Sequence, residues 1–179
     1  MQSIWHTFFS EPTGRNYLRV RQRVLKYRRQ PKVDELLKVE LLFEQEQYEE
    51  VRAEAAKLLP RWGLSPRLYR LSGLAAWQLQ DRQAAELDKF LYDACLAGIQ
   101  GTGDGSPSRP YWVIYPSDPD ELLEQMGMEV AGRSLVRGPW GPAELVESRD
   151  GRVWWFTYQP AELRRRSSWI PQPMSMAGR

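Results

Sequence analysis

Apolar residues recur at helical spacing through the N-terminal part of the chain. Between residues 15 and 29, Tyr17, Val20 and Val24 fall on one face of a helix, while most of the arginines fall on the opposite face. A segment with one apolar and one charged face predicts an amphipathic helix that packs on its apolar side. Pro31 ends this helix, because proline disfavours helical geometry in the residue before it.

Four more segments with helical spacing follow. They span residues 34–45, 48–59, 66–80 and 83–99. The first is apolar on nearly all sides, which is typical of a helix packed between other helices. Cys95 lies on the apolar side of the last segment, and we predict that it is a small core residue and not a nucleophile, because free cysteine is usually buried.

The predicted helices contain an internal repeat. When the sequence is aligned with itself at a shift of 34 residues, Leu37 matches Leu71, and the turn after residue 45 matches the turn around residue 81. This period, about 34 residues with two helices in each repeat, is the tetratricopeptide pattern, in which antiparallel hairpins stack side by side. The match is degenerate, since the consensus glycine appears only as Gly73.

The composition changes after the last predicted helix. Residues 98–110 read GIQGTGDGSPSRP, which is typical of a loop, and the apolar run at 111–115 predicts a buried strand. Asp118 and Pro119 predict the start of a short helix, with aspartate as the N-cap, proline in the first position and Glu121 in the third. Asp118 is thus expected to cap its own helix.

Three strands are predicted after this helix. They lie around residues 130–136, 143–147 and 152–158. The last two are joined by Arg149-Asp150-Gly151, which suits a hairpin turn because glycine accepts positive φ.

Together these patterns predict an α+β fold. About five helices form tetratricopeptide-like antiparallel α-hairpins, packed against a small C-terminal sheet that includes one short helix. We divide the chain into an N-terminal arm (1–14), a helical-hairpin region (15–100), a small α/β cap (101–160) and a flexible basic tail (161–179).

The loop and the segments after it resemble one bacterial protein family. The resemblance is carried by the TGDGSP loop at residues 102–107, by Tyr111, Val113 and Ile114, by Met126-Gly127-Met128 and by Arg133-Ser134-Leu135-Val136. That family is an uncharacterised domain of unknown function, with tetratricopeptide-like helices before a GDG-S-P loop and a small sheet. The resemblance covers roughly residues 15 to 158 and departs at Pro110, where the family tends to carry alanine. It implies this architecture and no activity.

Charge is unevenly distributed although the net charge is only +2. Residues 1–32 hold eight basic residues and one acidic residue, whereas residues 33–60 hold eight acidic and three basic residues. Such blocks are either contact surfaces or solvated faces. A single cysteine excludes an intrachain disulfide, and the chain shows neither a signal peptide nor a long apolar run. We therefore expect a cytoplasmic protein without a membrane partner.

No constellation of residues indicates catalysis. His6 is the only histidine, so it has no second histidine with which to share a metal ion. The GTGDGS segment leaves a predicted helix and enters a strand, whereas phosphate-binding loops leave a strand and open a helix. We predict no enzymatic activity, no cofactor and no metal site. An enzyme that uses this loop and Asp104 is the weakest of three functional hypotheses.

The leading hypothesis is a non-catalytic protein-interaction or scaffold module. The concave face of the hairpins would hold a peptide or another protein. The candidate contact residues are Glu40, Tyr69, Arg70 and Trp77, with Trp140 at the tip of a hairpin.

The alternative hypothesis is nucleic-acid binding through the basic first helix. Its candidate residues are Arg15, Arg19, Arg23, Lys26 and Arg29. Such contacts neutralise phosphates and give salt-sensitive affinity. A structural interpretation competes with it: the acidic second and third helices would absorb this charge within the fold. Arg21 and Arg28 fall on the apolar arc, so they must snorkel or pair with acidic groups of a neighbouring helix.

Overall fold

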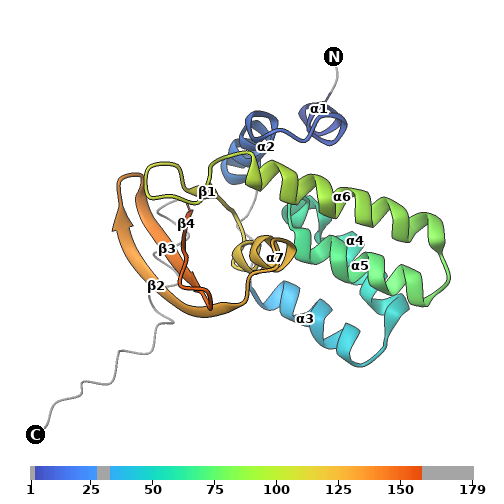
Figure 1. Ribbon diagram of the computed structural model, residues 1–179. Coiled ribbons are helices and arrows are strands. Elements are labelled where there is room, and N and C mark those ends of the chain that lie inside the picture. The colour runs from blue at the N-terminus through green and yellow to red at the C-terminus, as the bar shows by residue number, and fades with distance from the viewer. Residues whose placement is uncertain (1–2, 28–32, 159–179) are drawn as a thin grey trace, which may run out of the picture.

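The structure is a computed structural model that describes residues 3–27 and 33–158. Within these residues a layer of helices lies beside a small four-stranded sheet (Figure 1). In chain order the elements are α1 (Ile4–Ser10), α2 (Gly14–Tyr27), α3 (Val33–Glu44), α4 (Tyr48–Trp62), α5 (Pro66–Gln78), α6 (Arg82–Gln100), β1 (Tyr111–Trp112), α7 (Asp118–Gln125), β2 (Val130–Gly138), β3 (Gly141–Ser148) and β4 (Val153–Thr157). The predicted α+β class is confirmed. None of the helices in the described ranges is long and apolar enough to cross a membrane.

The two central hairpins, α3–α4 and α5–α6, repeat the same turn. Glu46 and Gln80, which lie one repeat period apart, both take left-handed backbone conformations, with φ of 59° and 62°. In each turn the next residue donates its N–H to the carbonyl five positions earlier, at 2.9 Å in both cases. This bond after a left-handed residue is a common way to end a helix. The repeat period of the sequence is therefore present in the backbone.

The helix α5 lies at the centre of the helical layer. It packs against α3, α4, α6 and α7. Gly73 permits close contact with α6, because a Cβ at this position would lie 3.1 Å from the Cβ of Asp88. The consensus glycine of the repeat thus serves helix packing.

The predicted N-terminal arm contains the short helix α1. The hydroxyl of Ser3 accepts a hydrogen bond from the N–H of Trp5 at 3.3 Å, and Phe8 is fully buried. At Gly98 of α6 a Cβ would lie 2.8 Å from the Phe8 ring and 2.9 Å from the Cβ of Tyr17. Because that glycine has no side chain, α1 and α2 pack directly on the backbone of α6.

The sheet has the strand order β1-β4-β3-β2. The strands β2, β3 and β4 are antiparallel neighbours, and β1 runs parallel to β4. All three predicted C-terminal strands are present, and the turn at residues 149–151 joins β3 to β4 with Gly151 at a φ of 82°.

The strand predicted at residues 111–115 is shorter than expected. Only Tyr111 and Trp112 form β1. The N–H groups of Ile114 and Tyr115 donate to Oδ2 of Asp118, each at 2.9 Å, and do not continue a ladder. These two bonds turn the chain from β1 into α7.

The helical layer and the sheet region share one core. Trp62 at the end of α4 is 1% exposed, and its ring stacks on Tyr115, with centroids 4.7 Å apart and planes 14° apart. The Tyr115 hydroxyl also donates to the carbonyl of Arg61 at 2.8 Å. The segment between β1 and α7 is therefore fixed to the helical hairpins.

Candidate binding surface

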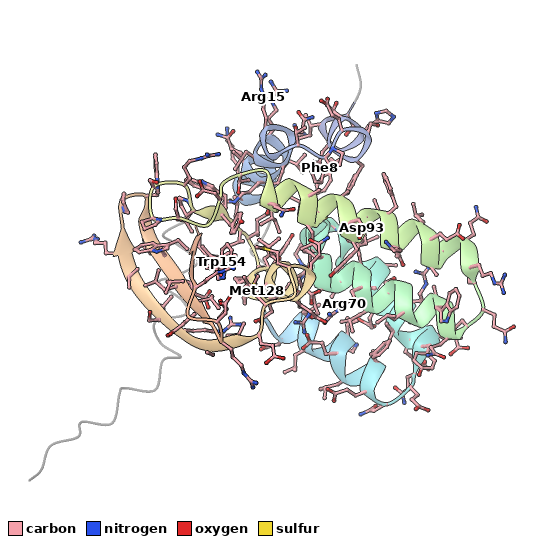
Figure 2. All side chains as sticks on the ribbon, viewed as in Figure 1. Phe8, Arg15, Arg70, Asp93, Met128 and Trp154 are labelled. Carbon is pink, nitrogen blue, oxygen red and sulfur yellow. The ribbon has the colours of Figure 1, made fainter. Side chains whose placement is uncertain are left out.

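One side of α5 carries two arginines followed by two large apolar residues. Arg67, Arg70, Leu74 and Trp77 are spaced by three or four residues, so they follow one side of the helix. Arg70 lies on the side of α5 that faces α7 (Figure 2). We call these four residues the α5 face.

The two arginines of the α5 face hold α7. Arg67 donates to Oε1 of Glu40 on α3 at 3.0 Å and also to Glu121 of α7. Arg70 pairs with the same Glu121 at 3.1 Å and with Glu124 at 2.6 Å. The N-terminal half of the α5 face is thus occupied by a helix of the chain itself. Two of the predicted contact residues, Glu40 and Arg70, serve this internal contact.

Glu121 is the centre of this ionic contact and is fully buried. Burial raises the pKa of its carboxyl group, whereas the nearby charges of Arg67 and Arg70 act in the opposite direction. Its Oε2 atom has no hydrogen-bond partner among the described residues. The buried carboxylate therefore depends on the two guanidinium groups for its stabilisation.

The C-terminal half of the α5 face is exposed. Leu74 is 47% exposed and Trp77 is 61% exposed. The two side chains are one helical turn apart, so they are neighbours on the surface of α5. The predicted contact residue Trp77 therefore lies on an accessible surface.

Tyr69, another predicted contact residue, is buried. Its hydroxyl donates to the carbonyl of Gly63 at 3.1 Å, and burial raises its pKa to well above the ordinary value. It faces the core beneath α5, away from the α5 face.

Trp140 lies at the tip of the β2–β3 hairpin, as predicted, and is 55% exposed. Its indole N–H donates to the carbonyl of Ser108 at 3.2 Å. Its ring meets Trp112 edge to face, with centroids 6.3 Å apart. Trp140 therefore attaches the hairpin tip to the glycine-rich loop while part of its ring stays accessible.

The glycine-rich loop leaves α6 and enters β1, as the sequence predicts. Asp104 and Gly105 donate their N–H groups to the carbonyl of Arg109, and Oδ1 of Asp104 accepts from the N–H of Ser106 at 3.0 Å. Hydrogen bonds from Ser106 lower the pKa of Asp104. The loop therefore uses its own polar groups to hold its conformation.

The fold requires glycine at position 105 of this loop. It is buried at a φ of 76°, and a Cβ there would lie 2.6 Å from the ring of Trp154 and 2.8 Å from the ring of Tyr111. Its carbonyl accepts from the N–H of Trp155 at 2.9 Å. The glycine thus lets the loop pack on the end of the sheet.

The basic side of α2 is exposed. Arg15, Arg19, Arg23 and Lys26 all lie on it, and the side chain of Arg15 points away from the fold (Figure 2). Arg15 and Arg19 form no ion pair with any residue in the described ranges. The fifth candidate, Arg29, lies outside the described residues, as does Arg28.

Arg21 differs from its neighbours on α2 because it is buried. Its guanidinium donates to the carbonyl of Val113 at 2.9 and 3.2 Å and lies 5.3 Å from the centre of the Trp112 ring. From its place on the apolar arc we expected Arg21 to snorkel or to pair with acidic groups of a neighbouring helix, and its burial excludes snorkelling. Its hydrogen bonds go to a backbone carbonyl after β1, and no pattern in the sequence indicated this partner.

Asp118 forms a buried polar centre that sequence reasoning missed. We expected it to cap α7, but the cap residue is Ser117, and the Asp118 carboxylate accepts from the preceding turn instead. Burial is the main cause that raises the pKa of Asp118 to about 7. Its Oδ1 and the nearby hydroxyl of Tyr17 are buried without hydrogen-bond partners in the described part of the chain.

No protein-family model, curated protein or solved structure matches this chain. Within residues 3–27 and 33–158, no group of three or more histidine, cysteine or acidic side chains is placed to hold a metal ion. Cys95 is fully buried, and burial raises the pKa of its thiol well above the ordinary value. A buried thiol of raised pKa is a poor nucleophile.

Proposed function

We propose that this protein is a non-catalytic interaction module that binds a helical segment of another protein. The contact surface is the exposed half of the α5 face, formed by Leu74 and Trp77. The observation that carries this proposal is the division of the α5 face into a half that already holds a helix and a half that is exposed.

The contact with α7 supports this interpretation. The side chains of Arg67 and Arg70 pair with carboxylates of α7, so this side of α5 has the chemistry to receive a helix. The same side continues into Leu74 and Trp77, which offer exposed apolar area. Tryptophan is among the residues that contribute most to protein interfaces when it becomes buried.

The chemistry of the polar groups also favours binding over catalysis. Asp104 is committed to the loop that it stabilises, and Cys95 is inaccessible. The buried carboxylates Asp118 and Glu121 bond to backbone N–H groups and to arginines of the fold. General acid–base catalysis instead requires such groups within reach of a substrate in a cleft.

The first experiment is to purify the tagged protein from its native cells, with and without nuclease, and to identify what is associated with it. We expect a protein partner at near-equal amounts that resists nuclease. Trp77→Ala and Leu74→Ser should each weaken its binding by at least about tenfold, since a buried anchor at an interface contributes about 2 kcal/mol or more.

Matched controls lie on α6. Leu87 and Phe90 are 57% and 51% exposed, so Leu87→Ala and Phe90→Ala remove similar apolar area outside the α5 face. The proposal requires these variants to keep the affinity of the wild type. Equal loss of binding in both pairs, or full binding by Trp77→Ala, would contradict it.

A further inference from the structure

Two exposed helix sides carry opposite charge, and they belong to helices on opposite sides of the helical layer. The exposed side of α2 carries Arg15, Leu18, Arg19, Gln22, Arg23 and Lys26. We call these six residues the basic face. On α3 the exposed side consists of Asp34, Leu37, Leu41 and Glu44, which we call the acidic face. Each face has one or two leucines between charged residues.

The two faces match in length. Arg15 and Lys26 are separated by about 16 Å along the helix axis, and Asp34 and Glu44 by about 15 Å, from a rise of about 1.5 Å per residue. The leucines in between are partly exposed, at 36% for Leu18, and 49% and 46% for the two leucines of α3. An apolar contact flanked by opposite charges is thus available when the helices lie side by side.

Each face has two charged residues without an ionic partner within the fold that the structure describes. Arg15, Arg19, Asp34 and Glu44 form no ion pair with residues in the described ranges, whereas Lys38 beside the acidic face already pairs with Glu54 at 3.2 Å. The helix α2 packs against α1 and α6. It lies at the top of Figure 1, with α6 and α5 between it and α3.

The repeat gives an independent reason to expect a cover on α3. The positions one repeat period after Leu37 and Leu41 are Leu71 and Ala75, and both are buried in α5, where neighbouring helices cover them. In α3, the first helix of the repeat, the same positions are exposed. End repeats of stacked helical hairpins normally carry polar residues on their outer side, so exposed leucines at this end indicate a partner.

We propose that the acidic face of α3 binds the basic face of α2 of a second copy of this chain. Because the two faces differ, the contact is heterologous, and successive copies associate head to tail. This proposal concerns surfaces separate from the α5 face, so either proposal can fail without the other. A net charge of +2 leaves little overall attraction for a polyanion, which favours a second copy over nucleic acid as the occupant of the basic face.

The test is a charge exchange followed by sedimentation. The wild-type protein should show a mass that rises with concentration, and this association should weaken with salt because exposed charges are screened. Arg15→Glu/Arg19→Glu and Asp34→Lys/Glu44→Lys should each raise the dissociation constant of self-association by at least about tenfold. A mixture of the two variants should associate again, because the unaltered α3 face of one variant can bind the unaltered α2 face of the other, and their altered faces are also complementary.

Several outcomes would overturn the proposal. A wild-type protein that stays monomeric at low salt over the whole concentration range contradicts it without any variant. Variants that keep their helical circular dichroism but fail to associate when mixed also contradict it. Salt-sensitive binding of the monomer to a DNA or RNA duplex, abolished by Arg15→Glu/Arg19→Glu, would assign the basic face to nucleic acid instead.

Discussion

The carboxylate of Asp118 lies where α7, α2 and α6 meet. Its charge acts on the hydroxyl of Tyr17 from α2 and on the thiol of Cys95 from α6, and it adds to the effect of burial in raising the pKa of both groups. Two backbone N–H groups and the charge of Arg21 favour its ionised form, but burial outweighs them. At the scale of single residues, burial therefore moves the titration of this carboxyl group close to neutral pH.

The pH dependence of unfolding follows from this carboxyl group. Its pKa of about 7 in the folded protein lies above its ordinary value of 3.8, so the folded state binds more protons between these pH values. The contribution of this group to the free energy of unfolding should therefore fall as the pH rises from about 4 to about 7, by on the order of 4 kcal/mol. Urea unfolding at a series of pH values measures this slope.

Asp118→Asn isolates the contribution of this group. The amide oxygen can still accept from the N–H groups of Ile114 and Tyr115, but the side chain no longer titrates. We expect the variant to lose most of the slope, while Glu86→Gln, which removes an exposed charge from α6, keeps it. A slope that is unchanged in Asp118→Asn would show that other groups cause it.

At the scale of elements, the contact between α5 and α7 rests on a buried ion pair. Arg67→Ala leaves Glu121 buried with one guanidinium fewer, so we expect a loss of about 3 kcal/mol in the free energy of unfolding. Lys89→Ala is the matched control, since Lys89 and Asp93 form an exposed pair on α6. Its expected cost is at most about 0.5 kcal/mol.

Urea unfolding of both variants at one pH makes this comparison. A double variant, Arg67→Ala/Glu121→Ala, should cost less than the sum of the two single changes, because it also removes the unpaired buried carboxylate. Equal, small effects of Arg67→Ala and Lys89→Ala would mean that the α7 contact is held by Leu122 and Leu123 alone.

The periodicity of apolar residues predicted those elements that are defined by the pattern of their own residues. The five helices from α2 to α6 and the strands β2 to β4 each contain an apolar pattern long enough to identify them. The helix α1 has only seven residues, and its formation depends on burial of Phe8 against Gly98. The early end of β1 depends on the carboxylate of Asp118, which sequence reasoning assigned to a helix cap.

The candidate site was predictable only in part, because contacts between residues far apart in the sequence leave no local pattern. The repeat identified the inner helix of the second hairpin, and with it Arg70 and Trp77. No local pattern indicated that α7 would return to cover Arg67 and Arg70, because those contacts join residues 54 positions apart. Charge blocks likewise showed that α2 and α3 are opposite in sign, but only the structure shows that they lie on different sides of the helical layer.

At the scale of the whole molecule, Trp62 and Tyr115 join the helical layer to the sheet region through a buried stacking contact. Trp62 also donates its indole N–H to Glu35 of α3 at 3.0 Å, so it connects α3, α4 and the turn before α7. Trp62→Ala should lower the free energy of unfolding by about 3–5 kcal/mol, since it leaves a cavity at this junction. Hydrogen exchange should then accelerate together in α5 and in β3–β4.

The exposed Trp77 supplies the control for this last prediction. Trp77→Ala removes the same side chain from the surface, so its effect on stability should stay within about 0.5 kcal/mol. If Trp62→Ala accelerated exchange in the helices and left β3 and β4 protected, the sheet would be a separate folding unit. Joint acceleration would instead mean that a ligand held by the α5 face also stabilises the sheet, because binding to the folded state shifts the whole unfolding equilibrium.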